Sequence, residues 1–111
     1  ASGPNADYFA PAIEETDKLV VPTISLYEVF KKTFRVFGQE RALQVAALMQ
    51  QGELVPLDSG LALLAALTSV ENDLPMADAI MLATARSRHA VLWTQDADFQ
   101  GIEGVRYRPR G

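Results

Sequence analysis

The chain has 111 residues, 49% of them hydrophobic, which predicts a single folded domain over residues 1–111 and argues against disorder. Its formal net charge of −4 at pH 7 argues against nucleic-acid binding through a broad basic surface, so that contact with RNA would rest on local basic patches or on metal ions. The absence of cysteine excludes disulfides and thiolate metal sites and suits a cytoplasmic protein, and no apolar run reaches the roughly 18 residues of a membrane span.

The first half of the chain is predicted to contain three helices and one strand. A first helix is expected over residues 5–16, and the apolar run "KLVVP" over 18–22 is typical of a buried strand. Aromatic residues at helical spacing predict a helix over 24–38 with Gly38 as its C-terminal cap. Another helix is expected over 39–52.

The second half of the chain alternates strands with helices. Strands are predicted over 53–57, 90–94 and 105–109, helices over 60–72 and 75–88, and a loop or short helical turn over 96–104. This alternation predicts an α/β fold with a mostly parallel sheet and right-handed crossovers.

In an open parallel sheet, ligands bind beyond the carboxyl ends of the strands. Four acids precede strands and are expected at the opposite edge: Glu14, Glu15, Asp17 and Glu53. Five acids are expected at or near the ligand-binding edge: Glu28, Asp58, Asp78, Asp96 and Asp98.

Asp78 is an acid in the apolar stretch "LPMADAIMLATA". Its neighbours at helical spacing are all apolar: Leu74, Pro75, Met81 and Leu82. No cation on its own helix can therefore pair with it, which favours a metal ion or another part of the chain as its partner. The alternative is an acid that is stabilised only by the dipole at the start of its helix.

The other acids have stronger structural alternatives. The spacing of Ser25 and Glu28 matches a capping box, and the spacing of Glu28 and Lys32 matches an ordinary surface ion pair. Asp96 and Asp98 directly follow a strand and are also typical of a turn that aspartate side chains stabilise.

Two further residues are interpreted as structural. Asp58 is expected to cap the helix that follows it. His89 lies between a predicted helix and a predicted strand, and a cation at the C-terminal end of a helix is common because the helix dipole favours it.

The available chemistry is therefore a set of carboxylates at one sheet edge, without histidine or cysteine. Hard oxygen ligands suit Mg²⁺ or Mn²⁺. Such ions with carboxylates typically support phosphoryl chemistry, in which an ion helps to form hydroxide and stabilises the leaving oxygen.

The chain resembles the PIN domain, and most closely the small VapC-type toxin ribonucleases of toxin–antitoxin pairs. The segments that carry the resemblance are "VPTISLYEVFKK", "LPMADAIMLATARSRHAVLWTQDADF" and "GVRYRPR". The resemblance implies a three-layer α/β/α fold and an endoribonuclease that depends on Mg²⁺ or Mn²⁺. It also implies a homodimer that a cognate antitoxin inhibits.

The resemblance also implies roles for individual residues. It assigns the metal ligands of the family to Glu28, Asp78 and Asp96. Thr94 is then expected to position water or phosphate, and Asp98 is the second acid of the family's Asp-x-Asp pattern.

The chain departs from the family at its beginning. The family starts with a central strand that ends in an aspartate, and this chain has neither. We therefore expect a truncated domain with a vacant central position, which swapping, a partner's strand or rearrangement would fill. For the same reason we expect these residues alone to have weak activity or none.

The candidate contacts to RNA phosphates are the cations that follow Glu28, namely Lys31, Lys32 and Arg35. The alternative function is a non-catalytic PIN-like interaction module that uses the aromatic face of the same helix, namely Tyr27, Phe30, Phe34 and Phe37. A phosphatase of the haloacid dehalogenase type and a response-regulator receiver fit less well. The Asp-x-Asp pattern comes late in the chain, and no lysine follows Lys32.

Overall fold

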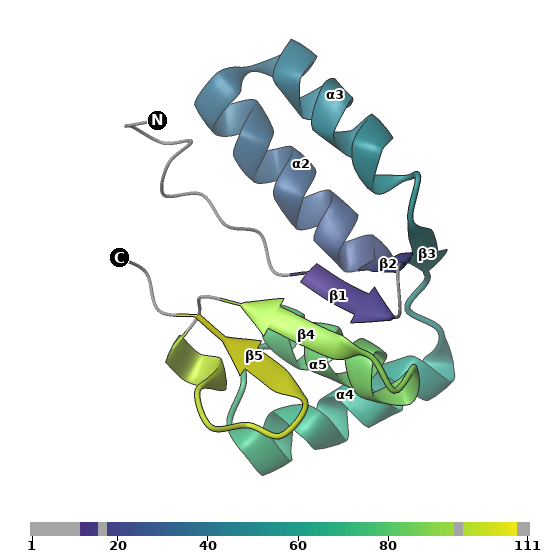
Figure 1. Ribbon diagram of the computed structural model, residues 1–111, viewed down its shortest axis with the longest axis vertical. Coiled ribbons are helices and arrows are strands. Elements are labelled where there is room, and N and C mark those ends of the chain that lie inside the picture. The colour runs from purple at the N-terminus through teal and green to yellow at the C-terminus, as the bar shows by residue number, and fades with distance from the viewer. Residues whose placement is uncertain (1–11, 16–17, 95–96, 109–111) are drawn as a thin grey trace.

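The computed structural model describes residues 12–15, 18–94 and 97–108 of the chain. A five-stranded sheet packs with two pairs of helices (Figure 1). The strands are β1 (Ala12–Glu15), β2 (Lys18–Pro22), β3 (Glu53–Val55), β4 (Val91–Thr94) and β5 (Val105–Tyr107). The helices are α2 (Thr23–Phe37), α3 (Gln39–Met49), α4 (Ser59–Asn72) and α5 (Met76–Ser87), and η1 (Ala97–Phe99) is a 3₁₀ turn.

The strand order in the sheet is β3-β2-β1-β4-β5. The pairs β2–β3 and β4–β5 are parallel, whereas β1 is antiparallel to both β2 and β4. Because β1 opposes both of its neighbours, β2 and β4 run in the same direction. The predicted α/β class with a mostly parallel sheet is confirmed.

The prediction of a helix over 5–16 is wrong for Ala12–Glu15, which form the central strand β1. The remaining residues of that prediction that precede Ala12 lie outside the described part of the chain. The physical reason is the pairing demand of the neighbouring strands. The inner backbone edges of β2 and β4 need hydrogen-bond partners, and a strand between them supplies both. In the described sheet, β1 therefore occupies the central position.

The main core lies between the sheet and α5. Ile13 pairs in register with Val20 on one side and Leu92 on the other, and all three side chains are at most 1% exposed. They pack in one cluster with α5 residues such as Leu82 and with Phe99 of η1. A single apolar layer across three strands therefore holds α5 against the sheet.

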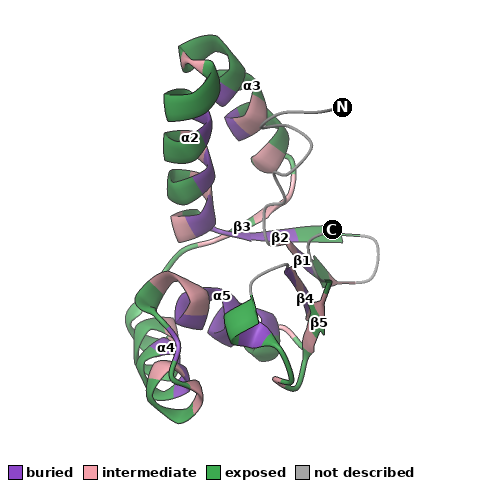
Figure 2. Cartoon of the chain, turned by 90° about the vertical axis from the view of Figure 1, so that its left-hand side faces the viewer, coloured by how far each residue is buried: buried purple, intermediate pink, exposed green. Residues whose placement is uncertain are grey.

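The apolar character of α5 follows from its place between the sheet and α4. Seven consecutive residues of α5, Ala79–Ala85, are buried, and Figure 2 shows this helix mostly in the buried colour. One side of α5 faces the sheet cluster, and Ile80 and Ala83 on the other side pack with Ala65 of α4. Within the described residues, no helix is long and apolar enough to cross a bilayer.

Two predicted helix caps are confirmed. Gly38 ends α2 with a φ of 94°, a value that favours glycine, and its N–H donates to the Phe34 carbonyl at 2.9 Å. Asp58 begins α4, and its carboxylate accepts a hydrogen bond from the Leu61 N–H at 2.9 Å.

The central position of Ile13 yields a stability prediction. Ile13→Ala should lower the free energy of unfolding by about 2–5 kcal/mol, since it leaves a cavity in the layer that joins β2, β1 and β4. Urea titration followed by circular dichroism measures this loss. Glu14→Ala, at the exposed neighbouring position, is the control and should cost less than about 1 kcal/mol. Equal losses in the two variants would contradict the central role of Ile13.

Candidate functional site

The carboxyl ends of β2 and β4 lie at the same edge of the sheet. Pro22 ends β2 and Thr94 ends β4, and these strands run in the same direction on either side of β1. Because β1 runs the opposite way, its first residue, Ala12, lies at this edge, paired with Trp93. The described part of the central strand therefore brings a methyl group rather than a carboxylate to this edge.

The structure brings Glu28 and Asp78 together at this edge. Both residues line one cavity of about 60 Å³, to which α2 and α5 contribute residues of their first two turns. Glu28 is exposed and Asp78 is half-buried. This volume exceeds that of a single water molecule, so the recess that the two carboxylates line is large enough for water or a small ion.

Asp78 lies in the first turn of α5. The helix begins after Pro75, which makes no side-chain capping hydrogen bond. The positive end of the helix dipole lies there and favours an acidic side chain. A carboxylate at this position is suited to act as a metal ligand.

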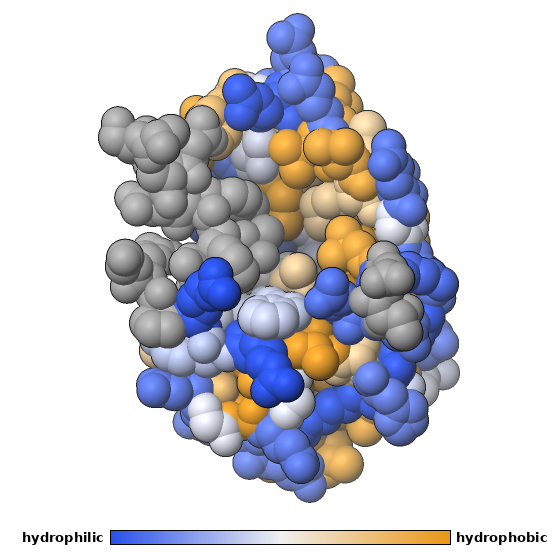
Figure 3. Space-filling model, in the orientation of Figure 1, coloured by the Kyte–Doolittle hydropathy of each residue, from blue (hydrophilic) through white to orange (hydrophobic). Residues whose placement is uncertain are grey.

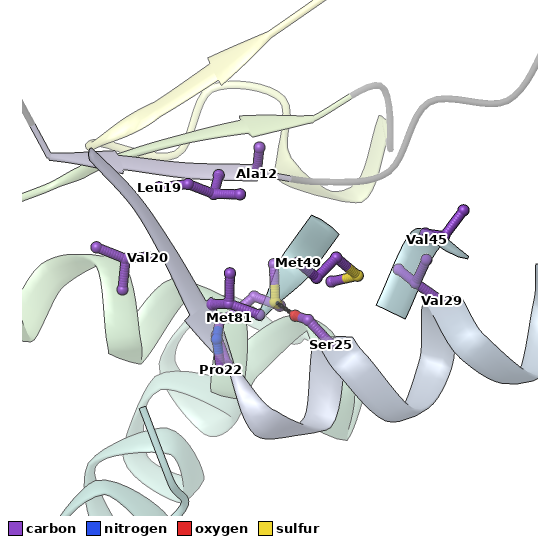
Figure 4. Close-up of a pocket in the computed structure, with 10 residues that line it drawn as sticks. Ala12, Leu19, Val20, Pro22, Ser25, Val29, Val45, Met49 and Met81 are labelled. Atoms are coloured by element: carbon purple, nitrogen blue, oxygen red, sulfur yellow. Dashed lines mark hydrogen bonds between the residues drawn. The ribbon is translucent and has the colours of Figure 1, made fainter. Parts of the chain in front are cut away.

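The predicted capping box of Ser25 and Glu28 is wrong. The helix begins at Thr23, two residues before Ser25. Its N-cap residue is Pro22, which makes no side-chain capping hydrogen bond. Ser25 is instead buried, and its hydroxyl donates a hydrogen bond to the sulfur of Met81 in α5 (Figure 4). Sequence reasoning missed this contact because the two residues are 56 positions apart. Their contact brings the start of α2 next to α5, where Glu28 and Asp78 line the same recess.

A second, larger cavity of about 170 Å³ lies next to the first one and shares Ser25, Val29 and Met81 with it. Among the described residues, its lining comes from β1, β2, α2, α3 and α5 and carries no charged side chain. On the face in Figure 3, hydrophobic side chains gather over the α2–α3 pair above the sheet.

The remaining predicted site residues are placed as follows. Thr94 is 1% exposed at the end of β4, where its carbonyl accepts a hydrogen bond from the Arg108 N–H at 2.9 Å. Asp98 is exposed in η1. Asp96 lies outside the described residues. Neither Thr94 nor Asp98 lines the cavity that holds Glu28 and Asp78.

The donor set fits a hard divalent cation in part. In the described part of the chain, no group of three or more acids or histidines is arranged to hold a metal ion. The pair Glu28 and Asp78 nevertheless meets the usual requirement of Mg²⁺, which binds through one or two carboxylates and retains water for its other positions.

Glu15 and Glu53 lie at the opposite edge of the sheet, as predicted. Arg88, directly after α5, contacts Glu53 at 2.6 Å and Glu15 at 3.3 Å, and Lys18 contacts Glu53 at 2.8 Å. Hydrogen bonds from Arg88 and then Lys18 lower the pKa of Glu53 to about 2. This cluster ties the end of α5 to three strands, so these acids have a structural role.

Comparison with known proteins agrees with this architecture. A family model described as the PIN domain matches residues 1–105. The chain belongs to the PIN-domain family. The PIN domain is also similar to a chain of a solved structure, "Toxin-antitoxin complex from Klebsiella pneumoniae", with a TM-score of 0.67 and 25% sequence identity. This match covers 78% of the present chain and 71% of the other one. No curated protein matches.

The ion cluster of this PIN domain predicts a loss of stability in acid. Because the folded state lowers the pKa of Glu53 from 4.5 to about 2, the stabilisation is complete above pH 4.5 and is lost as the pH falls toward 2. Arg88→Met removes the largest cause of the shift, so unfolding should begin at a higher pH. The fluorescence of Trp93 during acid titration measures this.

The control is Arg106→Met, which removes an exposed cation from β5. It should leave the acid-unfolding midpoint close to that of the parent protein. An unchanged midpoint in Arg88→Met, or an equal shift in both variants, would contradict the role of the cluster.

Proposed function

We propose that this protein is a metal-dependent endoribonuclease that acts as the toxin of a toxin–antitoxin pair. PIN domains are generally nucleases, and the family membership supports this class of activity. The observation that carries the proposal is the cavity at the carboxyl edge of the sheet, which Glu28 and Asp78 line from two helices that are distant in sequence.

In the proposed mechanism, Glu28, Asp78 and Asp96 would hold Mg²⁺ or Mn²⁺. The bound ion would supply a nucleophilic hydroxide and stabilise charge on the phosphate. Asp78 lies in the first turn of α5, where the positive end of the helix dipole favours an acidic side chain. Thr94 is assigned to position water or phosphate at the end of β4. Asp98 is assigned a supporting role near the same strand end.

The partner and location follow from the same proposal. The similar solved structure is described as a toxin–antitoxin complex, which supports a cognate antitoxin protein as the inhibitor of this chain. The proposed substrate is RNA, and the proposed location is the cytoplasm, where both RNA and an antitoxin are available.

The proposed metal site is tested by calorimetric titration with Mn²⁺. The parent protein should bind the ion, and Glu28→Gln or Asp78→Asn should weaken binding at least about tenfold, because even outer-shell partners of metal ligands contribute about 10- to 100-fold. Cleavage of RNA should depend on Mn²⁺ and should fall in the same variants. The cleavage rate should be low, because Ala12 supplies no carboxylate at the centre of the edge.

The matched control is Glu71→Gln, which neutralises an exposed acid on α4 outside the cavity. It should change neither metal binding nor cleavage. Absence of any Mn²⁺ binding by the parent protein would overturn the enzyme proposal and favour a non-catalytic interaction module.

The proposed homodimer is supported by an unusual surface on α4. Leu63, Leu67 and Val70 repeat at helical spacing, and they are 75%, 53% and 82% exposed, respectively. Apart from Glu71, this helix carries no charged residue. Contiguous apolar surface of this kind typically marks an interface, and a second copy of the chain presents the same apolar face.

The dimer is tested with Leu67→Glu. Because a charge in an apolar interface is costly to desolvate, this variant should be monomeric at a concentration at which the parent protein is dimeric. Sedimentation equilibrium measures the mass. Leu48→Glu, at a leucine of α3 that is 64% exposed, is the control and should remain dimeric. A monomeric parent protein at high concentration would contradict the proposal.

A further inference from the structure

The helix α2 leads outward from the acid cavity. Ser25, Val29 and Thr33 are its buried residues and repeat about once per turn, so they define the side that faces the protein. Figure 2 shows the other side of α2 mainly in the exposed colour, along a helix pair that projects from the sheet. The outward side of α2 is thus a solvent-facing surface that begins near the cavity.

Aromatic side chains are exposed on this outward side. Tyr27 is 59% exposed and Phe34 is 45% exposed. They are seven residues apart, which is about two helical turns, so they point in nearly the same direction about 10 Å from each other. Large aromatic residues are normally buried in a protein of this kind, so their exposure calls for a function.

Cations alternate with these aromatic residues. Lys31 lies between them, with its Nζ 5.5 Å from the centre of the Tyr27 ring. Lys32 and Arg35 follow Glu28 at spacings of four and seven residues and form the adjacent row of the same helix. Between Tyr27 and Phe34, α2 carries one acid and two lysines, and Arg35 comes next, in a chain whose overall charge is −4.

We propose that this outward face of α2 binds single-stranded RNA next to the acid cavity. Bases would stack on Tyr27 and Phe34, and phosphates would contact Lys31, Lys32 and Arg35. Proteins that bind single strands combine a cationic track with aromatic stacking platforms. The inference rests on the proposed ribonuclease function, because it names the form of RNA that reaches the same site.

The composition of the face favours RNA over a protein partner. The exposed apolar surface of α4 is aliphatic and has no cation, and depletion of charged residues is typical of the core of an interface between protein chains. The face of α2 instead interleaves aromatic rings with positive charges. Unpaired bases offer a flat surface to each ring, whereas a base-paired duplex keeps its bases stacked inside.

The test measures the affinity of a fluorescein-labelled oligouridylate by fluorescence anisotropy. The Asp78→Asn background and EDTA prevent cleavage, so binding is measured whether or not the protein is an enzyme. Tyr27→Ala and Phe34→Ala should each weaken binding about tenfold, since loss of one stacked base costs on this order. Tyr27→Phe should retain the affinity. An RNA duplex should compete poorly.

Two comparisons separate stacking from charge and from folding. Lys31→Ala and Arg35→Ala should each reduce the dependence of log affinity on log salt by about 0.7, the value for one phosphate contact to a single strand. Leu43→Ala removes a leucine of α3 that is 52% exposed and should leave RNA affinity unchanged. Circular dichroism should show the same helix content in all variants.

Unchanged RNA affinity in both Tyr27→Ala and Phe34→Ala would overturn the inference and would favour a protein-binding role for this face. A second outcome distinguishes failure of the RNA-binding inference from failure of the proposed ribonuclease function. If the aromatic variants lose RNA binding while the parent protein neither binds Mn²⁺ nor cleaves RNA, the RNA track stands and the ribonuclease proposal fails.

Discussion

The pairing of β1 with both of its neighbours is the constraint on which the rest of this structure depends. Ile13 lies between Val20 and Leu92 in one apolar layer. In the described sheet, β1 alone joins the β2–β3 pair to the β4–β5 pair. Without it, both inner edges would carry unpaired backbone groups, and each such buried group is costly. The same strand fixes the spacing between the ends of β2 and β4, from which the candidate site is built.

The candidate site follows from where α2 and α5 begin relative to the sheet. Both helices begin at the edge of the sheet where β2 ends, and Ser25 in the first turn of α2 contacts Met81 in the second turn of α5. The middle of α5 is buried between the sheet and α4, so an acid there would have no solvent and no partner. Asp78 is accommodated because it stands in the first turn, where the helix has emerged at the edge. Burial thus explains both the apolar character of α5 and the position of its one acid.

Local sequence patterns predicted most of the helices and strands, because the interactions that start or end these elements involve residues close together in the chain. Gly38 and Asp58 act through contacts three or four residues away, and the run from Lys18 to Pro22 became a strand with the predicted bounds. The edge rule for parallel sheets also placed Glu28 and Asp78 together. The prediction failed where the cause was distant. The segment Ala12–Glu15 has no strand pattern of its own, and its conformation follows from pairing with residues up to 81 positions away. The spacing of Ser25 and Glu28 indicated a cap, but the burial of Ser25 depends on α5.

The distribution of charge follows from the two edges of the sheet. At one edge, Glu53 and Glu15 are neutralised by Lys18 and Arg88, so this edge contributes stability and little net field. At the other edge, the acids of the cavity would repel a polyanion unless cations offset them. Such cations lie along α2, one or two turns beyond Glu28, rather than inside the cavity. This separation would let a metal ion bind at the cavity while a negatively charged strand is attracted from the side. A uniformly basic surface would be unnecessary in this arrangement, which reconciles the acidic composition of the chain with the proposed RNA substrate.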